Sequence, residues 1–476
     1  MDNIKNKSLL SILCEPGEHA LAIDNPADGS VVGYIPWQSE AEIDQCINKS
    51  CLAQKLWQKR PAKERSCLMY RWYERVMDNQ ADLARLMTLE QGKPLAEAMG
   101  EVAYGASFIQ WFAEEGKRAY GTTIPGHTGD RRLMTIKQPV GVAAAITPWN
   151  FPIAMITRKA APALAAGCSF IVKPANQTPL CAYAILELAR QAGMPEDVLQ
   201  VVVHHSPEQV GDLFTHHPVI RKLSFTGSTR VGRRLIAQSA ETIKNTSMEL
   251  GGDAPFIVFD DADIVQAVQG ALASKFRNAG QTCVCANRFY VHDAIYDQFV
   301  SQFTEAVKSL KVGSGLEDGV QIGPLIDVQA KERIFRTINL AVEQGATIVT
   351  GGKPLDGCFV EPTVLTDVQH SMSFLREELF GPVAPIMRFT NDEELLEQAN
   401  DTIYGLAAYF YSRDISRIWQ VAEALDYGMV GINEGIISTE LAPFGGVKQS
   451  GFGREGGQEG LEAYLETKYL CFGGIQ

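Results

Sequence analysis

The sequence lacks the features that mark a membrane-spanning, secreted or nucleic-acid-binding protein. No uninterrupted apolar run reaches the ~18 residues that a membrane span requires. Met1–Glu15 has no basic start followed by a long apolar stretch, so no secretory signal is visible. The 43 Lys and Arg are outnumbered by 56 Asp and Glu, and a net charge of −13 argues against a basic surface for nucleic acid or anionic lipid. These absences predict a cytoplasmic protein with no nucleic-acid partner and no membrane partner.

Disulfide signatures and repeats are also missing. The ten cysteines are scattered from Cys14 to Cys471 without a CxxC pair, a pattern that suits reduced thiols in a reducing compartment. Four histidines, His204, His205, His216 and His217, form two adjacent pairs that rarely converge on one ion, so no metal site is expected. A chain of 476 residues with 46% hydrophobic residues predicts two or three globular domains.

Hydrophobic periodicity divides the chain into a helix-rich beginning and two alternating regions. Helical spacing covers Ala41–Trp57, Ala62–Gln80, Gln80–Glu90 and Leu95–Glu115. From Val140 short apolar runs alternate with helical patterns, and the predicted strands are Gly141–Ile146, Cys168–Val172, Leu199–Val203 and Lys222–Phe225. Strands and helices in this rhythm indicate a parallel sheet with crossover helices, the usual site of a bound dinucleotide.

A second α/β region follows, with predicted helices such as Ile264–Phe276 and Ile295–Leu310. Its predicted strands are Pro255–Phe259, Phe289–His292, Ala346–Val349 and Met429–Ile432. Outside both regions, Arg131–Gln138 and Leu461–Cys471 alternate polar and apolar residues as strands do. Exposed strand edges invite pairing with another chain, so a subunit interface and a simple terminal hairpin both remain open.

Three local features carry chemistry before any family is considered. Cys283 stands among small polar residues after an apolar helix, where a turn would expose its sulfur, although a lone cysteine is inert in most proteins. Glu249 precedes two glycines where one α/β region passes into the next; a solvated acid before a hinge is the alternative. Phe225-Thr226-Gly227-Ser228 ends a predicted strand with small residues that let a helix begin close to a phosphate.

These features together resemble the aldehyde dehydrogenase superfamily over essentially the whole chain. Seven strings match its motifs in order: Pro148-Trp149-Asn150-Phe151-Pro152, Lys173-Pro174-Ala175, Phe225-Thr226-Gly227-Ser228, Glu249-Leu250-Gly251-Gly252, Gly280-Gln281-Thr282-Cys283, Glu378-Leu379-Phe380-Gly381-Pro382 and Pro443-Phe444-Gly445-Gly446. The resemblance implies an α/β fold with a doubly wound dinucleotide-binding domain (1–118 and 141–249), an α/β catalytic domain (250–447) and a small β oligomerisation arm (119–140 and 461–476). It also implies a homodimer or homotetramer.

The resemblance assigns a role to each motif. The Cys283 thiolate adds to the aldehyde carbonyl, and the Asn150 amide with the Cys283 N–H holds the oxyanion. The adduct passes a hydride to the nicotinamide, and Glu249 activates the water that releases the acid. The implied cofactor-binding residues are Trp149, Lys173, Asn176, Gly227, Ser228, Glu378 and Phe380. A cysteine hydrolase without redox chemistry would share Cys283 and Glu249, but Lys173 and Gly227-Ser228 favour a dinucleotide.

Within the superfamily the chain is most similar to bacterial succinate-semialdehyde dehydrogenases. The matching strings are Ile156-Thr157-Arg158-Lys159, Lys275-Phe276-Arg277-Asn278, Cys283-Val284-Cys285-Ala286-Asn287 and Gly435-Ile436-Ile437-Ser438. The similarity implies that Arg158, Arg277 and Ser438 bind the distal carboxylate of an anionic aldehyde, because an arginine fork suits a planar carboxylate. Capping of a helix face is the alternative for Arg158. Glutarate semialdehyde remains a second substrate, since one methylene discriminates only ~10–200-fold.

Cofactor preference and regulation rest on single residues. Asn176 stands where many NAD-preferring relatives have Glu, and a neutral side chain tolerates a 2′-phosphate, so NADP is favoured over NAD. Cys285 is either a disulfide partner of Cys283 or a plain structural thiol.

The chain departs from the family pattern at three places that concern the cofactor and the substrate. His204-His205-Ser206-Pro207 replaces a glycine turn near the adenosine half of the cofactor, which puts His205 near a 2′-phosphate or reroutes the loop. Asp253 and Glu434 are unusual at their positions. An acid at 434, near the expected substrate mouth, would repel an anionic aldehyde.

Overall fold

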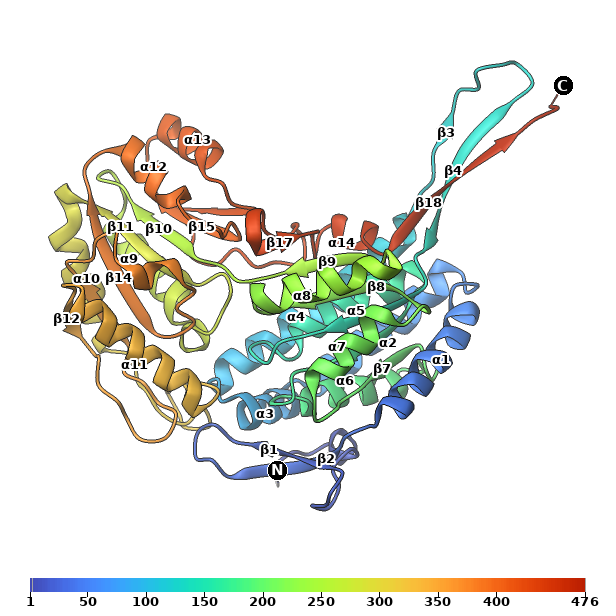
Figure 1. Ribbon diagram of the computed structural model, residues 1–476, viewed down its shortest axis with the longest axis horizontal. Helices are drawn as coiled ribbons and strands as arrows, with labels where there is room; N and C mark the ends of the chain where they lie inside the picture. Colours follow the sequence, from blue (N-terminus) through green and yellow to red (C-terminus); the bar gives the residue numbers. More distant parts are fainter. Residues whose placement is uncertain (2, 476) are drawn as a thin grey trace.

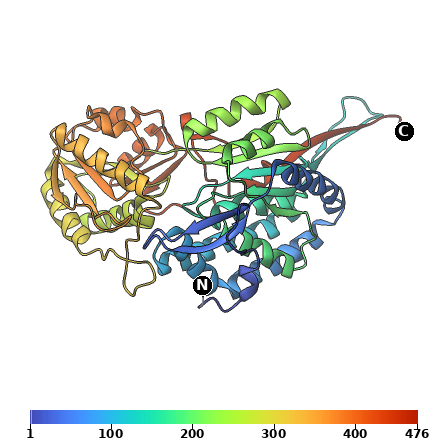
Figure 2. The ribbon, with the colours of Figure 1, turned by 60° about the horizontal axis from the view of Figure 1, so that its bottom comes forward.

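The computed structural model describes residue 1 and residues 3–475, which form two α/β lobes and a projecting arm (Figure 1). Figure 2 shows the lobes side by side, with the arm extending from the first lobe away from the second. No helix within the described ranges is both long and apolar enough to cross a membrane.

The first lobe is built on a six-stranded sheet with the order β17-β9-β8-β5-β6-β7. Its parallel strands are β5 (Val142–Ile146), β6 (Ser169–Lys173), β7 (Leu199–Val201), β8 (Ile220–Thr226) and β9 (Asn245–Glu249). The crossover helices are α5 (Ala154–Ala166), α6 (Leu180–Gln191), α7 (Pro207–His216) and α8 (Thr229–Ser239), followed by η3 (Ala240–Thr242). The predicted parallel sheet is confirmed. One strand was not predicted: β17 (Gly451–Phe452) returns from near the end of the chain and pairs antiparallel with β9.

Helices cover both faces of this sheet, as in a doubly wound fold. Ala144 and Ile171 face a core shared with α1, α7 and α8, whereas Ala143 and Phe170 face α5 and α6. The N-terminal elements back these layers: η1 (Lys7–Leu10), β1 (Ala20–Asp24), β2 (Val31–Pro36), α1 (Glu40–Trp57), α2 (Ala62–Asp78), α3 (Gln80–Gln91), α4 (Leu95–Glu115) and η2 (Gly116–Arg118). The α1 helix begins at a capping box in which the Ser39 and Glu42 side chains bond each other's backbone N–H.

The second lobe contains a seven-stranded sheet with the order β12-β13-β14-β11-β10-β15-β16. The strands are β10 (Ala254–Val258), β11 (Ala286–His292), β12 (Thr347–Thr350), β13 (Thr363–Thr366), β14 (Val383–Phe389), β15 (Ala407–Tyr411) and β16 (Met429–Ile432). The helices are α9 (Ile264–Phe276), η4 (Arg277–Gly280), η5 (Asp293–Ile295), α10 (Tyr296–Lys308), α11 (Val328–Glu343), η6 (Ser373–Arg376), α12 (Asp392–Asn400), α13 (Ile415–Ala424) and η7 (Lys448–Ser450). The strands run parallel except at the edge, where β12 pairs antiparallel with β13.

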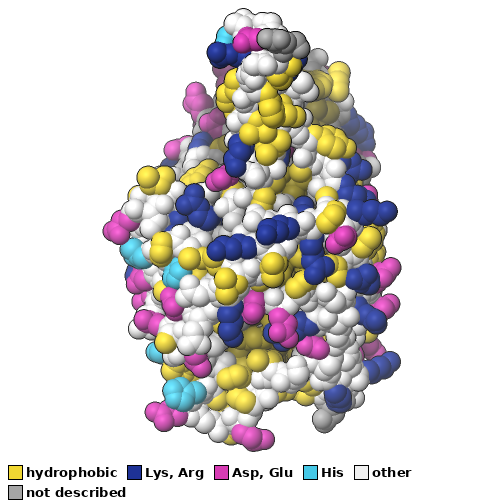
Figure 3. Space-filling model, turned by 90° about the vertical axis from the view of Figure 1, so that its right-hand side faces the viewer, with side chains coloured by type: hydrophobic (Ala, Val, Ile, Leu, Met, Phe, Trp, Pro, Cys, Tyr) yellow, Lys and Arg dark blue, Asp and Glu magenta, His cyan; other side chains and the backbone are white. Residues whose placement is uncertain are grey.

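The arm is a three-stranded antiparallel sheet of β3 (Thr123–Ile124), β4 (Arg132–Pro139) and β18 (Leu465–Phe472). The prediction of a strand over Leu461–Cys471 was wrong at its beginning. Glu459–Glu462 forms α14, and Leu461 and Tyr464 are buried in the first-lobe core, so alternation starts only at Leu465. Figure 3 faces the arm and shows hydrophobic side chains on its surface, where Ile124, Tyr469 and Phe472 are exposed.

Candidate active site

Cys283 lies in the loop between η4 and β11, and its side chain is half-buried against the second-lobe core. Two close backbone approaches fix this loop. A Cβ at Gly280 would collide with the carbonyl oxygen of Gly381, and one at Gly252 would collide with that of Cys283. Burial raises the pKa of the Cys283 thiol to about 12 in the protein without ligands, and the positive charge of Arg158 opposes this rise. The sulfur is therefore mostly protonated until substrate and cofactor change its surroundings.

Asn150 follows β5 and faces the nucleophile loop across the boundary between the lobes. Its Nδ2 donates to the carbonyl oxygen of Gln281 at 3.0 Å, two residues before Cys283. Its backbone carbonyl accepts hydrogen bonds from Lys93 Nζ (2.8 Å) and Asn278 Nδ2 (3.0 Å). An amide nitrogen carries two protons, and only one is engaged by Gln281. The second is available to a substrate oxygen, which matches the predicted role in the oxyanion site.

Glu249 ends β9 and is 2% exposed. Neither carboxyl oxygen has a hydrogen-bond partner in the described part of the chain. Burial raises the pKa of Glu249 well above its usual value, and the negative charge of Glu455 adds to the rise, whereas Arg158 and Lys159 oppose it. A carboxylate with a raised pKa is a stronger base than an exposed one, and its free oxygens can accept a proton from water.

The predicted phosphate-binding turn joins β8 to α8. Ser228 is the N-cap of α8, with its hydroxyl accepting from Val231 N at 3.4 Å, and the first helical turn carries no acidic residue. The first N–H groups of a helix have no partner within the helix and attract anions. Lys173, at the end of β6, donates to Asn176 Oδ1 at 2.9 Å, and burial lowers the pKa of Lys173 to about 8. A helix start and a buried lysine without a carboxylate partner fit the phosphates and ribose of a dinucleotide.

The departure at His204-His205 lies beside this cluster. Asn176 Nδ2 donates to the carbonyl oxygen of His204 at 2.9 Å and approaches that of His205 at 3.5 Å. The two imidazole rings pack against Trp37, with centroids 5.4 and 4.6 Å away. The His204-His205 loop therefore lies against Asn176 and, through Asn176, beside Lys173.

Glu378, Trp149 and Phe380 meet between the lobes. Glu378 Oε1 accepts from Gly252 N at 3.3 Å, and burial raises the pKa of Glu378 to about 8. The Trp149 and Phe380 rings lie edge to face, with centroids 5.6 Å apart. The structure therefore groups these three predicted cofactor residues on the Gly252 side of Cys283.

A cavity of about 290 Å³ contains two of the residues that were predicted to bind the substrate. Its wall is formed by Lys93, Glu97, Gly100, Glu101, Tyr104, Phe151, Arg277 and Ser438. The Arg277 guanidinium lies 5.4 Å from the centroid of the Phe151 ring and has no ion-pair partner among the described side chains. Arg277 and Ser438 were predicted to share a site, and the structure brings them into one cavity. Glu97 and Tyr104 were not predicted, because no motif contains them.

Arg158 lies deeper than this cavity. It is 2% exposed, forms an ion pair with Glu455, and its guanidinium lies 4.1 Å from the centroid of the Phe444 ring. Glu455 also pairs with Lys159. Burial raises the pKa of Glu455, but the positive charges of Lys159 and Arg158 outweigh this effect and hold that pKa below its usual value. Glu455 was missed in the sequence because nothing near it in the chain indicates a partner on α5.

The other singled-out residues have local partners. The Cys285 thiol donates to the carbonyl oxygen of Lys275 at 3.3 Å. Asp253 lies 2.8 Å from the equally buried Arg288, an ion pair that explains its presence. Glu434 accepts the N–H groups of Gly435 and Ile436 at 2.8 and 2.9 Å, and it does not line the cavity. No three His, Cys, Asp or Glu side chains within the described residues are grouped to hold a metal ion.

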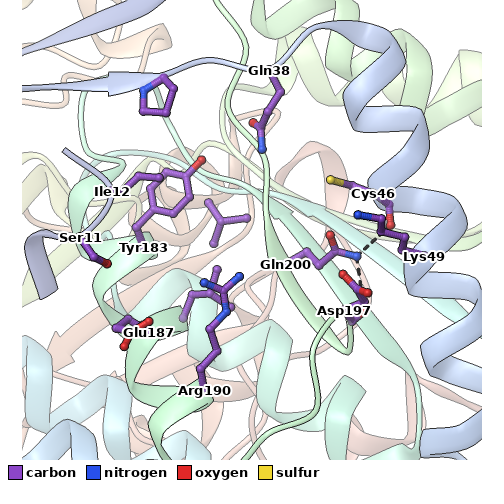
Figure 4. A pocket seen from close by; sticks show the side chains of 13 residues that line it. Ser11, Ile12, Gln38, Cys46, Lys49, Tyr183, Glu187, Arg190, Asp197 and Gln200 are labelled. Atoms are coloured by element: carbon purple, nitrogen blue, oxygen red, sulfur yellow. Dashed lines mark hydrogen bonds between the residues drawn. The ribbon is translucent and has the colours of Figure 1, made fainter. Parts of the chain in front are cut away.

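A separate cavity of about 390 Å³ lies between α1, α6 and β7 (Figure 4). Figure 4 shows Tyr183, Arg190 and Gln200 around it, and none of the predicted site residues lines it. Its wall shares no residue with the cavity that holds Arg277. It therefore plays no part in the site built around Cys283.

Comparison with known proteins agrees with this geometry. The chain belongs to the aldehyde dehydrogenase family, whose family model matches residues 14–470. It is 57% identical to a glutarate-semialdehyde dehydrogenase of Pseudomonas putida, over 95% of this chain and 94% of that protein. It is equally 57% identical to the NADP(+) succinate-semialdehyde dehydrogenase of Escherichia coli K12, over 95% and 94%. The crystal structure of succinate-semialdehyde dehydrogenase from Burkholderia pseudomallei matches with a TM-score of 0.97 at 52% identity, over 99% and 100% of the chains. The predicted family and fold are confirmed.

Proposed function

We propose that this aldehyde dehydrogenase oxidises an aldehyde with a distal carboxylate, succinate semialdehyde to succinate, with glutarate semialdehyde as the second substrate. The observation that carries the proposal is Arg277, a half-buried cation in the cavity next to Asn150 and Cys283, with no carboxylate within ion-pairing distance among the described side chains. Glu97 on the same wall interacts with Arg277 only over a longer distance, so the guanidinium donors stay free for the carboxylate of a ligand. The names of the two relatives at 57% identity support both substrates.

The side chains divide the reaction between them. Cys283 Sγ, once deprotonated, forms a bond to the carbonyl carbon, and the Asn150 amide with the Cys283 N–H stabilises the oxyanion. Lys173, Glu378 and the start of α8 would hold a dinucleotide, which when bound would supply the hydride acceptor needed to convert the adduct to a thioester. Glu249 then removes a proton from water, whose oxygen attacks the thioester and releases the acid and the Cys283 thiolate.

For the cofactor we propose NADP ahead of NAD. Asn176 carries no charge and would not repel a 2′-phosphate, and Lys173 beside it supplies a cation. Matched kinetics with both dinucleotides test the order, and a strong preference for NAD would reverse it. The loss of the Lys173 charge above about pH 8 should weaken binding of either dinucleotide, which fluorescence titration can follow.

We further propose a cytoplasmic homodimer or homotetramer assembled through the arm. All ten cysteines are free, as in a reducing compartment. The long β18 strand leaves one edge of the arm sheet unpaired within the described chain, and Tyr469 and Phe472 on it are exposed. Light scattering during size-exclusion chromatography measures the assembly, and a monomer at all concentrations would contradict it.

The substrate is tested by initial rates of dinucleotide reduction at 340 nm. Succinate semialdehyde, glutarate semialdehyde and a neutral aldehyde of similar length are compared at equal enzyme concentration. We expect kcat/KM to favour the two anionic aldehydes by at least ~10-fold, the worth of one hydrogen bond to a charged group. Equal kcat/KM for the neutral aldehyde would refute the anionic substrate class, and no reduction with any aldehyde would refute the redox reaction.

A further inference from the structure

Asn278 lies where the nucleophile loop meets the first lobe, and all its polar atoms have partners. It is 1% exposed. Its N–H donates to Glu97 Oε2 at 2.8 Å, and its carbonyl accepts from the N–H and Nε2 of Gln281 at 3.0 and 3.1 Å. Its Oδ1 accepts from Gln91 Nε2 at 3.0 Å, while its Nδ2 donates to the carbonyls of Asn150 (3.0 Å) and Gln281 (3.3 Å). One buried side chain therefore bridges the two lobes.

The backbone at this point is in an uncommon conformation. Asn278 has φ 52° and ψ 38°, in the left-handed region, and Ala279 follows with φ 54°. Such a conformation costs roughly 1–2 kcal/mol for a residue with a Cβ and persists where the surroundings fix it. Asparagine tolerates it better than other side chains do. The bonds from Glu97 and Gln91 hold Asn278 in this state and so fix the turn that leads to Cys283.

The same contacts determine where the Asn150 amide points. Asn150 Nδ2 rests on the carbonyl oxygen of Gln281, and Asn278 Nδ2 donates to that same oxygen. Asn278 Nδ2 also holds the backbone carbonyl of Asn150, together with Lys93 Nζ. Both ends of Asn150 are therefore tied to Asn278. Lys93 holds only the backbone end.

We propose that Asn278 is a positioning residue that sets the Asn150 amide against Cys283 for oxyanion stabilisation. The inference rests on the proposed aldehyde oxidation and adds a residue to it. Asn278 does not line the substrate cavity, so its effect is independent of the charge of the aldehyde. Removing an oxyanion donor costs ~10²–10³-fold in kcat. Misplacing one should cost less, about 10–100-fold in kcat/KM.

Three variants separate the effect of the backbone conformation from that of the side chain. Asn278→Gly removes the carboxamide and still adopts the left-handed backbone conformation readily. Asn278→Ala removes the carboxamide and also disfavours that conformation. The third, Asn150→Ala, is combined with Asn278→Gly in a double-mutant cycle. We expect Asn278→Gly to lower kcat/KM by about 10–100-fold for succinate semialdehyde and by the same factor for a neutral aldehyde. The double variant should be no slower than Asn150→Ala alone, because Asn278 acts through Asn150.

A purely structural role would move other readouts. Alkylation of Cys283 by iodoacetamide needs only the thiolate and not the Asn150 amide, so its rate in Asn278→Gly should stay within about twofold of the wild type. Should the glycine variant not fold, Asn278→Asp takes its place, because Asp keeps the size and the acceptor for Gln91 but lacks the donor. For Asn278→Asp the comparison uses the neutral aldehyde and the double variant with Asn150→Ala, because the added carboxyl group would repel an anionic aldehyde and disfavour the Cys283 thiolate.

The outcomes that overturn the inference are specific. The inference fails if Asn278→Gly keeps the wild-type kcat/KM. It also fails if the double variant loses kcat/KM by the full product of the two single losses, or if Asn278→Gly loses alkylation rate and kcat/KM by the same factor. These failures leave the proposed function intact if the wild type oxidises aldehydes. A wild type that reduces no dinucleotide with any aldehyde refutes the proposed function instead.

Discussion

Arg158 and Arg277 approach Cys283 from the two lobes, and their surroundings differ in one respect. Arg158, on α5, is paired with Glu455 and covered by the Phe444 ring. Arg277, on η4, lines the cavity that holds Ser438, with no carboxylate within ion-pairing distance among the described side chains. An internal carboxylate cancels much of the attraction that Arg158 would exert on a ligand anion, whereas Arg277 keeps more of its attraction. The two like charges therefore differ in what they can offer an anion: Arg158 is held in a buried ion pair, and Arg277 has no such pair within the described chain.

The largest effect should come from removing the counter-charge that distinguishes the two arginines. Glu455→Gln leaves Arg158 and Lys159 as buried like charges. We expect the free energy of unfolding to fall by about 3–5 kcal/mol, the usual consequence of breaking a buried ion pair, measured by urea denaturation. Glu459→Gln, an exposed acid on α14, is the matched control and should be nearly neutral.

Glu455→Gln should also change how stability and thioester hydrolysis depend on pH. The pKa of Glu455 is held below its usual 4.5, so its stabilising charge is present above that value and is lost as pH falls further. Because the charge of Glu455 also raises the pKa of Glu249, the variant should shift the acidic limb of thioester hydrolysis to lower pH. An unchanged limb, followed by single-turnover release of the acid, would show that the two carboxyl groups are not coupled.

Next in size is the unpaired arginine. Arg277→Ala should lower kcat/KM for succinate semialdehyde by about 1.5–3 kcal/mol of transition-state binding, while a neutral aldehyde keeps its rate. The unfolding free energy should change little, since Arg277 has no ion pair to lose. An equal loss for both aldehydes would mean that Arg277 supports the loop rather than the substrate, and would remove the contrast with Arg158.

A smaller loss is expected at the hydroxyl that shares the cavity. Ser438→Ala should cost about 0.5–1.5 kcal/mol in kcat/KM for the anionic aldehyde, the worth of one neutral hydrogen bond. In the Arg277→Ala background the same change should cost less, because the carboxylate is no longer held in place. A Ser438→Ala effect larger than that of Arg277→Ala would reverse the assignment of the main anchor.

The smallest effect of a substitution should be that of Arg277→Ala on the reactivity of the Cys283 thiol, which interacts with both arginines. Since the pKa of Cys283 is about 12, alkylation by iodoacetamide should rise ~10-fold per pH unit between about pH 7 and 9. Arg277→Ala should slow alkylation throughout, because one cation that favours the thiolate is gone. A plateau below about pH 8 would show that the thiolate is already formed in the free enzyme.

Elements with strong local signals could be predicted from sequence. The α9 helix follows the predicted Ile264–Phe276 to the residue, because its apolar spacing is regular and Asp263 caps it. The β1–β2 hairpin was missed, since only Ile23 and Ile35 on its two strands are fully buried and the alternation is weak. The polar and apolar alternation that predicted β18 extends back to Leu461. The packing of α14 onto α5 depends on tertiary contacts, so this alternation does not reveal that the strand begins only at Leu465.

The residues of the candidate site also divide into those with a local sequence signal and those without one. Cys283, Asn150 and Glu249 sit in motifs that are contiguous in the chain, and the structure gathers them at the boundary between the lobes. Glu455 and Asn278 gain their importance from partners 297 and 128 residues away. No local pattern encodes such a distance. The sequence therefore did not predict the ion pair of Arg158 with Glu455.

Glu249 owes its surroundings to the far end of the chain. Gly451 in β17 is its antiparallel partner, Leu250 N donates to the carbonyl oxygen of Ser450 at 2.9 Å, and Glu455 follows shortly after. Contacts separated by some two hundred positions are among the slowest to form. During synthesis the nucleophile emerges long before the strand that completes the base site. Turnover can begin only after this segment has docked, so a nascent or C-terminally clipped polypeptide should contain Cys283 but remain catalytically silent.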